Sequence, residues 1–376
     1  MTRTLLGPAD VSDNDLTDMV ARSLGVDVAH VQTCEVEVAE YDIETLTTAG
    51  RYLVSGTAQH DGGTSPYSFY VKVVQSWART PQFQMVPEHL REFAAAGLPW
   101  RNEPRVYRSD LADHLPDGLS MPRVHGVVDL DEESAALWLQ HVDVDPAPWE
   151  PATFERAAYL LGRLAASPRV RPLTELGSTD VARAYAQGRV EHQLVPALRS
   201  DELWQHPAVA EAFDPALRDR IRRAADRLPE LLAELDAAPL GAAHGDACPR
   251  NLLIARGTSD EFVLIDFNFW SLAPLGFDLS QLLLGEVQLG ERPASELVDL
   301  EPVCLDAYVR GLRAEGCEVP APTVRRVHAL LMLLFWGLSA VPIEVVYGAP
   351  PPGPAGTTRQ RAEAAAFVLD LVEATD

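Results

Sequence analysis

The sequence predicts an α+β protein of two lobes, a small β-rich lobe followed by a larger, mostly helical one. Strand-like alternation dominates residues 34–142, and long helical patterns dominate after residue 152. Between them, residues 143–151 are rich in Pro and Asp, which is typical of a linker. We therefore expect domains at 1–142 and 143–376. The length of 376 residues suits two domains of ordinary size.

The first lobe is expected to open with a helix at 12–24 and to continue with strands. Ser12 is a candidate N-cap for that helix, and Asp15 favours its N-terminus. Residues 60–67 are predicted to be a turn because of their Gly and Pro content. Strands are predicted at 34–43, 51–59, 68–74, 121–130 and 134–142, with helical residues at 88–111 interrupted at 97–99.

The second lobe is expected to be helical around one compact strand–loop–strand segment at 241–267. The apolar run 329–343 is shorter than a bilayer-spanning helix and is interrupted by Pro342, so we interpret it as a buried helix. The Pro-rich tract 348–358 is predicted to be a loop. Long helices are expected at 152–166, 180–199 and 215–236.

Composition disfavours several kinds of partner. With 55 acidic and 31 basic residues the net charge is −24, which argues against nucleic acid and against an anionic membrane surface as partners. The same charge favours a cationic partner. The four cysteines form no metal-binding spacing, and the N-terminus has no apolar signal segment, so we expect a cytoplasmic protein with reduced thiols.

The stretch 242–270 (AAHGDACPRNLLIARGTSDEFVLIDFNFW) carries the chemistry. If its two apolar runs form a hairpin, Asn251 and Asp266 meet at one end, and Asp246 lies on the loop that leads in. A carboxylate beside an amide oxygen provides hard ligands for Mg²⁺, which needs only one or two carboxylates plus phosphates. Asp246 would then be free to accept a proton from an attacking hydroxyl. This combination suits phosphoryl transfer.

Here the chain resembles the aminoglycoside phosphotransferase and choline kinase family, which has the protein-kinase-like fold. HGDACPRN resembles the catalytic loop of that family, LIDFNFW its metal-binding segment, and GFDLSQLL (276–283) its following helix. The resemblance implies that Asp246 is the catalytic base and that Asn251 and Asp266 hold magnesium. It also implies that Asp278 braces the catalytic loop and that His244 orients it.

The resemblance further implies a nucleotide-binding lysine and a glutamate that positions it. Lys72 is the only lysine among 31 basic residues, and it lies on the third predicted strand. It follows Val71 rather than Gly, so a P-loop is excluded. Glu103 is the preferred partner, with Glu88 and Glu92 as the alternatives.

Other nucleotide contacts have weaker signals. Residues 46–54 would cover the phosphates with a single glycine, Gly50, and Arg51 is a candidate phosphate contact. The connector 137–142 would serve as the hinge that offers backbone groups to adenine, with Gln140 and Val142 at its end. Trp204, Trp270 and Trp336 are candidates to line an acceptor pocket, with a place in the core as the alternative.

Together these observations predict an ATP-dependent small-molecule kinase, with GTP as the other possible donor and Mg²⁺ as the metal. The acceptor would be a small hydroxyl compound that can carry an amine, such as an aminoglycoside-like antibiotic, an amino alcohol or a sugar. Antibiotic resistance, biosynthesis and primary metabolism stay open as roles. The alternative is a catalytically silent binding protein with a kinase fold. A protein kinase is disfavoured because the loop reads HGD rather than HRD and no APE segment follows.

Overall fold

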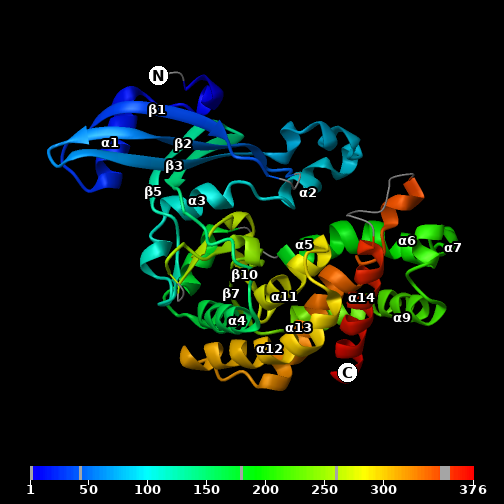
Figure 1. Ribbon diagram of the computed structural model, residues 1–376. Coiled ribbons are helices and arrows are strands. Elements are labelled where there is room, and N and C mark those ends of the chain that lie inside the picture. The colour runs from blue at the N-terminus through cyan, green and yellow to red at the C-terminus, as the bar shows by residue number, and fades with distance from the viewer. Residues whose placement is uncertain (1–2, 42–44, 178–180, 259–260, 348–355) are drawn as a thin grey trace. The chain divides into compact units, whose positions relative to one another are not determined.

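The computed structural model describes residues 3–41, 45–177, 181–258, 261–347 and 356–376. Strands dominate the N-terminal part and helices the C-terminal part (Figure 1), so the predicted α+β class is confirmed. Two compact units share the chain. Unit 1 comprises Met1–Asp113, Ser120–Asp145 and Leu253–Asn268, and unit 2 comprises His114–Leu119, Pro146–Leu252 and Phe269–Asp376.

The unit boundaries differ in detail from the predicted division at residue 142. The segment after residue 142 pairs with the residues that follow Leu253, since Val144 bridges Ala255 and the amide of Asp145 donates to Ile254 at 2.9 Å. Both segments therefore group with unit 1. The domain limits of the protein itself stay a prediction.

Unit 1 is built on a five-stranded antiparallel sheet in the order β1-β2-β3-β6-β5. The β2–β3 turn is shorter than predicted, because Thr64 to Tyr67 belong to β3 and Pro66 lies opposite Thr57. Pro66 lacks an N–H, but β6 pairs with β3 only from Phe69 onward, so no ladder bond is lost there. The strands are β1 (His30–Val38), β2 (Thr48–His60), β3 (Gly63–Gln75), β5 (Val124–Asp131) and β6 (Ser134–Gln140).

Three α-helices accompany this sheet: α1 (Asp13–Leu24), α2 (Arg91–Ala96) and α3 (Asn102–Arg108). The N-cap prediction for α1 is confirmed, because the amide of Asp15 donates to Ser12 Oγ at 3.1 Å. The core of this part includes Trp138 and Phe69, which are fully buried. The indole N–H of Trp138 donates to the carbonyl of Ala9 at 3.1 Å, so the buried polar atom is satisfied.

Unit 2 surrounds a short antiparallel pair, β7 (Leu240–Ala243) and β10 (Ser271–Pro274), with helices. Helices α4 and α12 approach closely through glycines: a Cβ on Gly162 would lie 2.1 Å from the Tyr308 carbonyl oxygen, and a Cβ on Gly311 would lie 2.0 Å from the Tyr159 carbonyl oxygen. The helices are α4 (Pro151–Ala166), α5 (Val181–Tyr185), α6 (Val195–Arg199), α7 (Asp201–Gln205), α8 (Pro207–Ala210), α9 (Pro215–Asp226), α10 (Leu228–Asp236), α11 (Phe277–Leu289), α12 (Leu297–Ala314), α13 (Ala321–Met332) and α14 (Thr357–Ala374).

Three short strands complete the described structure: β4 (Leu119–Ser120), β8 (Leu252–Leu253) and β9 (Phe262–Leu264). Strands β8 and β9 are neighbours in one sheet, so the predicted hairpin between the two apolar runs is confirmed. Asn251 precedes β8 directly, and Asp266 follows β9 by two residues.

The predicted long helices of unit 2 are less regular than their sequence pattern suggests. The predicted helix at 180–199 is described from residue 181 onward, where it is divided into α5, a π-helical segment at Ala186–Leu194, and α6. The apolar run 329–343 is buried, as predicted, but part of it, Leu333–Gly337, is also π-helical. Most of the predicted loop 348–358 lies outside the described residues.

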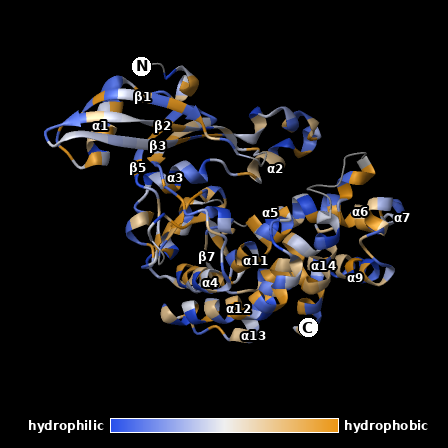
Figure 2. Ribbon diagram, viewed as in Figure 1, coloured by the Kyte–Doolittle hydropathy of each residue, from blue (hydrophilic) through white to orange (hydrophobic). Residues whose placement is uncertain are grey.

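Hydropathy varies along the helices of unit 2 rather than being uniformly apolar (Figure 2). In α12, for example, Leu300 and Leu305 are buried whereas Val298 and Val303 are exposed. No helix in the described part of the chain combines the length and the apolar character that crossing a bilayer requires.

Candidate active site

Lys72 lies at the centre of a buried ion cluster in unit 1. Its Nζ atom is 2.8 Å from Glu103 Oε2 and 3.1 Å from Asp266 Oδ2. Lys72 is 5% exposed and Glu103 is 1% exposed, whereas the Asp266 side chain is 27% exposed. The ammonium is thus shielded on the Glu103 side, and solvent reaches the cluster at Asp266.

The two carboxylates keep the lysine charged. Burial by itself lowers the pKa of Lys72, but the charges of Asp266 and Glu103 outweigh it and raise the pKa above its ordinary value. Burial also raises the pKa of Glu103, and the ammonium of Lys72 opposes that rise. Charged groups are costly to bury, and buried ionisable groups with strongly shifted pKa values are concentrated at functional sites, so this cluster marks a candidate site.

Each member of the cluster comes from a different element. Lys72 lies near the C-terminal end of β3, opposite Arg51 of β2 and Leu137 of β6. Glu103 is in the first turn of α3. Glu88 and Glu92, the alternatives considered from the sequence, are both exposed.

Asp266 has an unusual backbone conformation. Its φ of 64° is the single positive value among the described residues other than glycine. Asp tolerates the left-handed region better than most residues, but the conformation still costs energy and must be held by its surroundings. Such strain is concentrated at functional sites in proteins, which supports a special role for Asp266.

Asn268 supports this conformation, and sequence reasoning missed it. Its Nδ2 donates to Asp266 Oδ1 at 3.1 Å and to Thr47 Oγ1 at 3.2 Å. Its carbonyl accepts from Asn102 Nδ2 at 2.9 Å. Both asparagines are close in sequence to predicted site residues: Asn102 directly precedes Glu103, and Asn268 is two residues after Asp266. That closeness is the one sequence feature that could have identified them.

In unit 2, Asp246 and Asn251 are joined within one loop. Asn251 Nδ2 donates both to the carbonyl oxygen and to the Oδ2 of Asp246, each at 2.9 Å. This orientation leaves the amide oxygen of Asn251 without a hydrogen bond from any described residue. The loop therefore presents a positioned carboxylate next to an amide oxygen.

Asp278, at the start of α11, holds this loop through its backbone. Its two carboxylate oxygens accept the amides of His244 and Gly245, each at 2.8 Å. Burial raises the pKa of Asp278 to about 6, against the two N–H bonds that lower it. The Nδ1 atom of His244 accepts the amide of Asp246 at 3.3 Å, which continues the support toward the carboxylate.

Gly245 cannot be replaced without moving the loop. Its φ is +89°, and an added Cβ would lie 2.1 Å from the carbonyl oxygen of Phe269. The segment after Asp266 therefore packs against the backbone of the loop that carries Asp246.

The residues present fit a magnesium ion by donor chemistry. No group of three or more His, Cys, Asp or Glu side chains among the described residues could hold a metal by itself. Magnesium does not require such a group, because it binds through one or two carboxylates together with waters and phosphates. The amide oxygen of Asn251 and the partly exposed carboxylate of Asp266 are ligands of this kind.

Comparison with known proteins decides the family. The model of the phosphotransferase enzyme family matches residues 59–313, which is more than half of the chain. The chain belongs to the phosphotransferase enzyme family. The family predicted from the sequence motifs and the prediction of a phosphotransferase are both confirmed.

Solved structures similar to this phosphotransferase have low sequence identity. An aminoglycoside phosphotransferase from Alicyclobacillus acidocaldarius is 16% identical (TM-score 0.49) over 92% of this chain and 90% of its own. An amicoumacin kinase is 14% identical (TM-score 0.47) over 100% and 96%. The ethanolamine kinase of Plasmodium vivax is 10% identical (TM-score 0.47) over 98% and 88%. A search of curated proteins found no match.

The remaining predicted nucleotide contacts lie on the sheet of unit 1. Gly50 and Arg51 are inside β2, which begins at Thr48, so the predicted phosphate-covering loop at 46–54 is mostly strand. The guanidinium of Arg51 stacks on the ring of Tyr41, 4.0 Å from its centroid. Gln140 ends β6 and is exposed, and Val142 follows the strand.

Of the three tryptophans considered for an acceptor pocket, two belong to the core instead. Trp270 is fully buried and donates to the carbonyl of Leu173 at 2.9 Å, and Trp204 is buried and donates to Leu198 at 2.7 Å. Both are core residues with satisfied indole groups. Trp336 is half-buried and lines only a very small cavity.

Proposed function

We propose that this phosphotransferase is an ATP-dependent small-molecule kinase that moves the γ-phosphoryl group to a hydroxyl of its acceptor. The observation that carries the proposal is the buried cluster around Lys72. The only lysine of the chain is held by two carboxylates from distant elements. A core position that needed only packing would not hold three charged groups.

Lys72 would bind the phosphates of the nucleotide. An ammonium has three N–H donors, and two of its contacts here are to carboxylates, so the third can donate to a phosphate oxygen. Glu103 would keep the ammonium in place. Gly50 and Arg51 would also contact the phosphates. The backbone at Gln140 and Val142 would form hydrogen bonds with the adenine of the nucleotide. ATP is the proposed donor, and GTP is the alternative.

Asn251 and Asp266 would hold Mg²⁺, which when bound neutralises charge that develops on the transferring phosphoryl group. The protein's own part is to fix these two oxygens. Asn251 is oriented by its bonds to Asp246, and Asp266 by Asn268.

Asp246 would accept the proton of the acceptor's hydroxyl group. It would also align the hydroxyl oxygen with the γ-phosphorus that this oxygen attacks. The hydrogen bond from Asn251 fixes one carboxylate oxygen, so the rotation of the side chain is restricted. Asp278 would act as a positioning residue, because its bonds go to the backbone of the loop rather than to Asp246 itself.

The net charge of −24 favours an amine-bearing acceptor over an acidic one. Aminoglycoside-like antibiotics, amino alcohols and amino sugars satisfy this requirement. A role in antibiotic resistance would follow if the acceptor is an antibiotic. We also propose that the protein acts in the cytoplasm, where nucleoside triphosphates are available.

One observation favours the alternative, a catalytically silent binding protein. Asp266, a proposed metal ligand, is already paired with Lys72 in the described structure. If that pair persisted with nucleotide present, the metal would lose its carboxylate. Asp246→Asn separates the two functions, because it would abolish turnover by a kinase but leave a silent binder unchanged.

The first test is a thermal-shift experiment with ATP and GTP, each with and without magnesium. A ligand that binds only the folded protein stabilises it by roughly 2.7 kcal/mol at about 100 times its Kd. We expect a magnesium-dependent rise in Tm for the wild type and for Asp246→Asn. The rise should be lost in Lys72→Met and Asp266→Asn and kept in Asp299→Asn, a control at an exposed carboxylate.

A phosphorylation assay against a panel of amine-bearing alcohols completes the test. Asp246→Asn should bind nucleotide and lose at least about 100-fold in kcat, as expected for a general base. The kinase proposal fails if neither nucleotide shifts the Tm at millimolar concentration. Full turnover by Asp246→Asn would contradict the assigned role of that carboxylate.

A further inference from the structure

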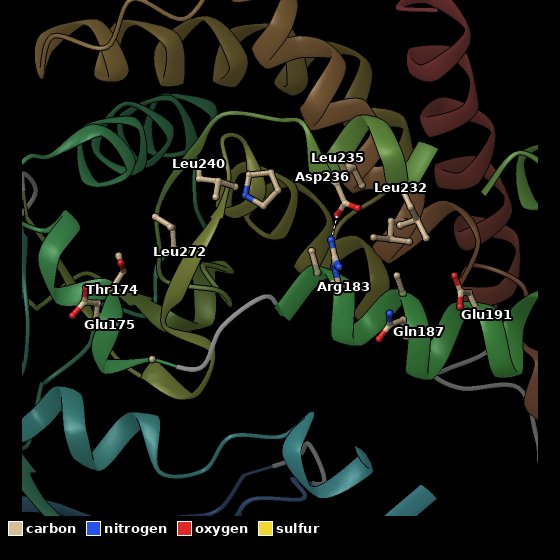
Figure 3. A pocket seen from close by; sticks show the side chains of 15 residues that line it. Thr174, Glu175, Arg183, Gln187, Glu191, Leu232, Leu235, Asp236, Leu240 and Leu272 are labelled. Carbon is tan, nitrogen blue, oxygen red and sulfur yellow. Dashed lines mark ion pairs between the residues drawn. The ribbon is translucent and has the colours of Figure 1, made fainter. Parts of the chain in front are cut away.

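A cavity of about 540 Å³ is lined entirely by residues of unit 2 (Figure 3). None of the site residues discussed above lines it. Drug-sized ligands occupy cavities of roughly this volume. Most of its wall is apolar, with contributions from the segments Arg171–Leu176, α5, α10, β7 and β10. The apolar lining residues are Ala182, Ala186, Leu232, Leu235, Leu240, Leu272, Pro274 and Leu334.

Both π-helical segments of the described chain contribute to this wall. Ala186, Gln187 and Glu191 come from Ala186–Leu194, and Leu334 comes from Leu333–Gly337. The rings of Tyr185 and Phe335 stack beside them, with centroids 4.4 Å apart. π-Helical turns are rare and occur frequently at functional sites, so the presence of two in this wall is evidence independent of the cavity itself.

The polar groups of the wall carry a net negative charge. Arg183 and Asp236 neutralise each other in an ion pair of 2.8 Å, drawn as a dashed line in Figure 3. Glu175 and Glu191 also line the cavity, on opposite sides of the view in Figure 3, and both are exposed. Neither forms an ion pair with another described residue. Two carboxylates are therefore available to a cationic ligand beside a large apolar surface.

The wall is continuous with the loop that carries Asp246. In the β7–β10 ladder, Leu272 of the wall lies opposite Ala242, two residues before His244. On the other side, Gly177 packs so closely on Trp270 that an added Cβ would lie 1.7 Å from its carbonyl oxygen. A ligand in the cavity would thus lie against the same short sheet that leads into the catalytic loop.

We propose that this cavity binds the acceptor, and that the acceptor is an amphipathic molecule with an apolar body and one or two cationic groups. The inference rests on the kinase function proposed above and specifies its substrate class. The carboxylates of Glu175 and Glu191, which have no ion-pair partner among the described residues, would balance one or two amines. A densely hydroxylated polycation would have more positive charges than the two carboxylates can balance. It also has little apolar surface to bury against the apolar wall.

The test uses N-dansylcadaverine, which has one ammonium group on an aliphatic chain and an apolar naphthalene. Binding is followed by fluorescence titration at low salt. We expect the double variant Glu175→Gln/Glu191→Gln to weaken binding by about 3- to 10-fold, the range for exposed charge pairs. Gln187→Trp, which fills the cavity from an exposed helical position, should weaken it at least as much.

Two controls define the outcomes. Glu318→Gln removes an exposed carboxylate outside the cavity and should bind the probe like the wild type. N-pentyl dansylamide lacks the ammonium, so it should bind the wild type more weakly than N-dansylcadaverine does. Its affinity should be the same for the wild type and for Glu175→Gln/Glu191→Gln. The proposal is overturned if the cavity variants bind the cationic probe like Glu318→Gln, or if the neutral probe binds as tightly.

Failure of the cavity and failure of the kinase function give different results. Asp246→Asn and Lys72→Met should retain wild-type affinity for the probe, because neither residue lines the cavity. If nucleotide raises the Tm but the cavity variants leave probe binding unchanged, only the acceptor site is wrong. Probe binding that depends on the cavity in a protein that binds no nucleotide would overturn the acceptor role together with the kinase function.

Discussion

Three charged side chains occupy one small volume around Lys72, and their protonation states depend on one another. The Glu103 side chain is almost inaccessible to solvent, so its ionised form is stabilised mainly by the neighbouring ammonium of Lys72. Removing the ammonium leaves an uncompensated buried carboxylate, and such losses cost about 3–5 kcal/mol. The same residues that would bind phosphate therefore also determine the stability of unit 1.

Lys72→Met should lower the free energy of unfolding by roughly 3 kcal/mol at pH 8 and by clearly less at pH 5.5. In the folded protein the pKa of Glu103 is raised to about 7, above its ordinary 4.5, and loss of Lys72 raises it further. A raised carboxyl pKa favours the folded state at low pH, and this advantage is lost as pH rises through the folded pKa. Urea unfolding at the two pH values measures the difference.

The control for this prediction is the double variant Lys72→Met/Glu103→Gln. With no buried charge to sustain, it should recover stability at pH 8 relative to Lys72→Met. An equal loss for Lys72→Met at both pH values would show that packing, rather than the charge of Glu103, explains the effect.

At the scale of elements, the loop before β8 depends on partners supplied by later segments. The first turn of α11 contributes Asp278, whose carboxylate holds two consecutive amides. The chain at Phe269 lies against Gly245, where only a glycine fits. The position of Asp246, the proposed base, therefore depends on residues more than 20 positions away.

Gly245→Ala should lower the free energy of unfolding by more than the roughly 1–2 kcal/mol that left-handed backbone costs an alanine. Its Cβ would also overlap the carbonyl of Phe269, so kcat should fall at least about 10-fold as Asp246 is displaced. Gly257→Ala is a matched control, because Gly257 has φ +82° and open space around its Cβ position. Similar stability losses in the two variants would disprove the close packing.

At the scale of the whole molecule, each unit contains a buried histidine that stays neutral. His125 in unit 1 packs against Phe69, with ring centroids 4.7 Å apart. His328 in unit 2 is fully buried; its Nδ1 is 3.1 Å from Ser280 Oγ, and its Nε2 is 3.9 Å from Glu301 Oε1. Burial lowers the pKa of each histidine to about 4.

Both units should lose stability in acid through these histidines. Because the ordinary histidine pKa of 6.5 lies above the folded value, the unfolded chain binds more protons between about pH 4 and 6.5. Stability therefore falls as pH decreases through this window, by about 2 kcal/mol per histidine between pH 7 and pH 5. Urea unfolding of His328→Gln should show a smaller decrease than the wild type. His89→Gln, at an exposed position, should not; a wild-type slope in His328→Gln would refute the assignment.

Local patterns were sufficient for much of the fold. Ser12 caps α1, the strands around Lys72 form, and the hairpin of β8 and β9 pairs as expected. Errors occurred where tertiary contacts override local pattern. Pro66, expected in a turn, is accommodated in β3 because β6 does not pair with that part of the strand. Trp204 and Trp270, candidates for an acceptor pocket, are buried in the core.

The sequence by itself determined the class of chemistry, because the order HGDACPRN, LIDFNFW and a single lysine is a local property of the chain. Only the tertiary structure decided which glutamate meets Lys72, why Gly245 is required, and where an acceptor cavity can form. Those outcomes depend on contacts between residues such as 72, 103 and 266, which are far apart along the chain. Packing brings such residues together, and no spacing rule in the sequence records it.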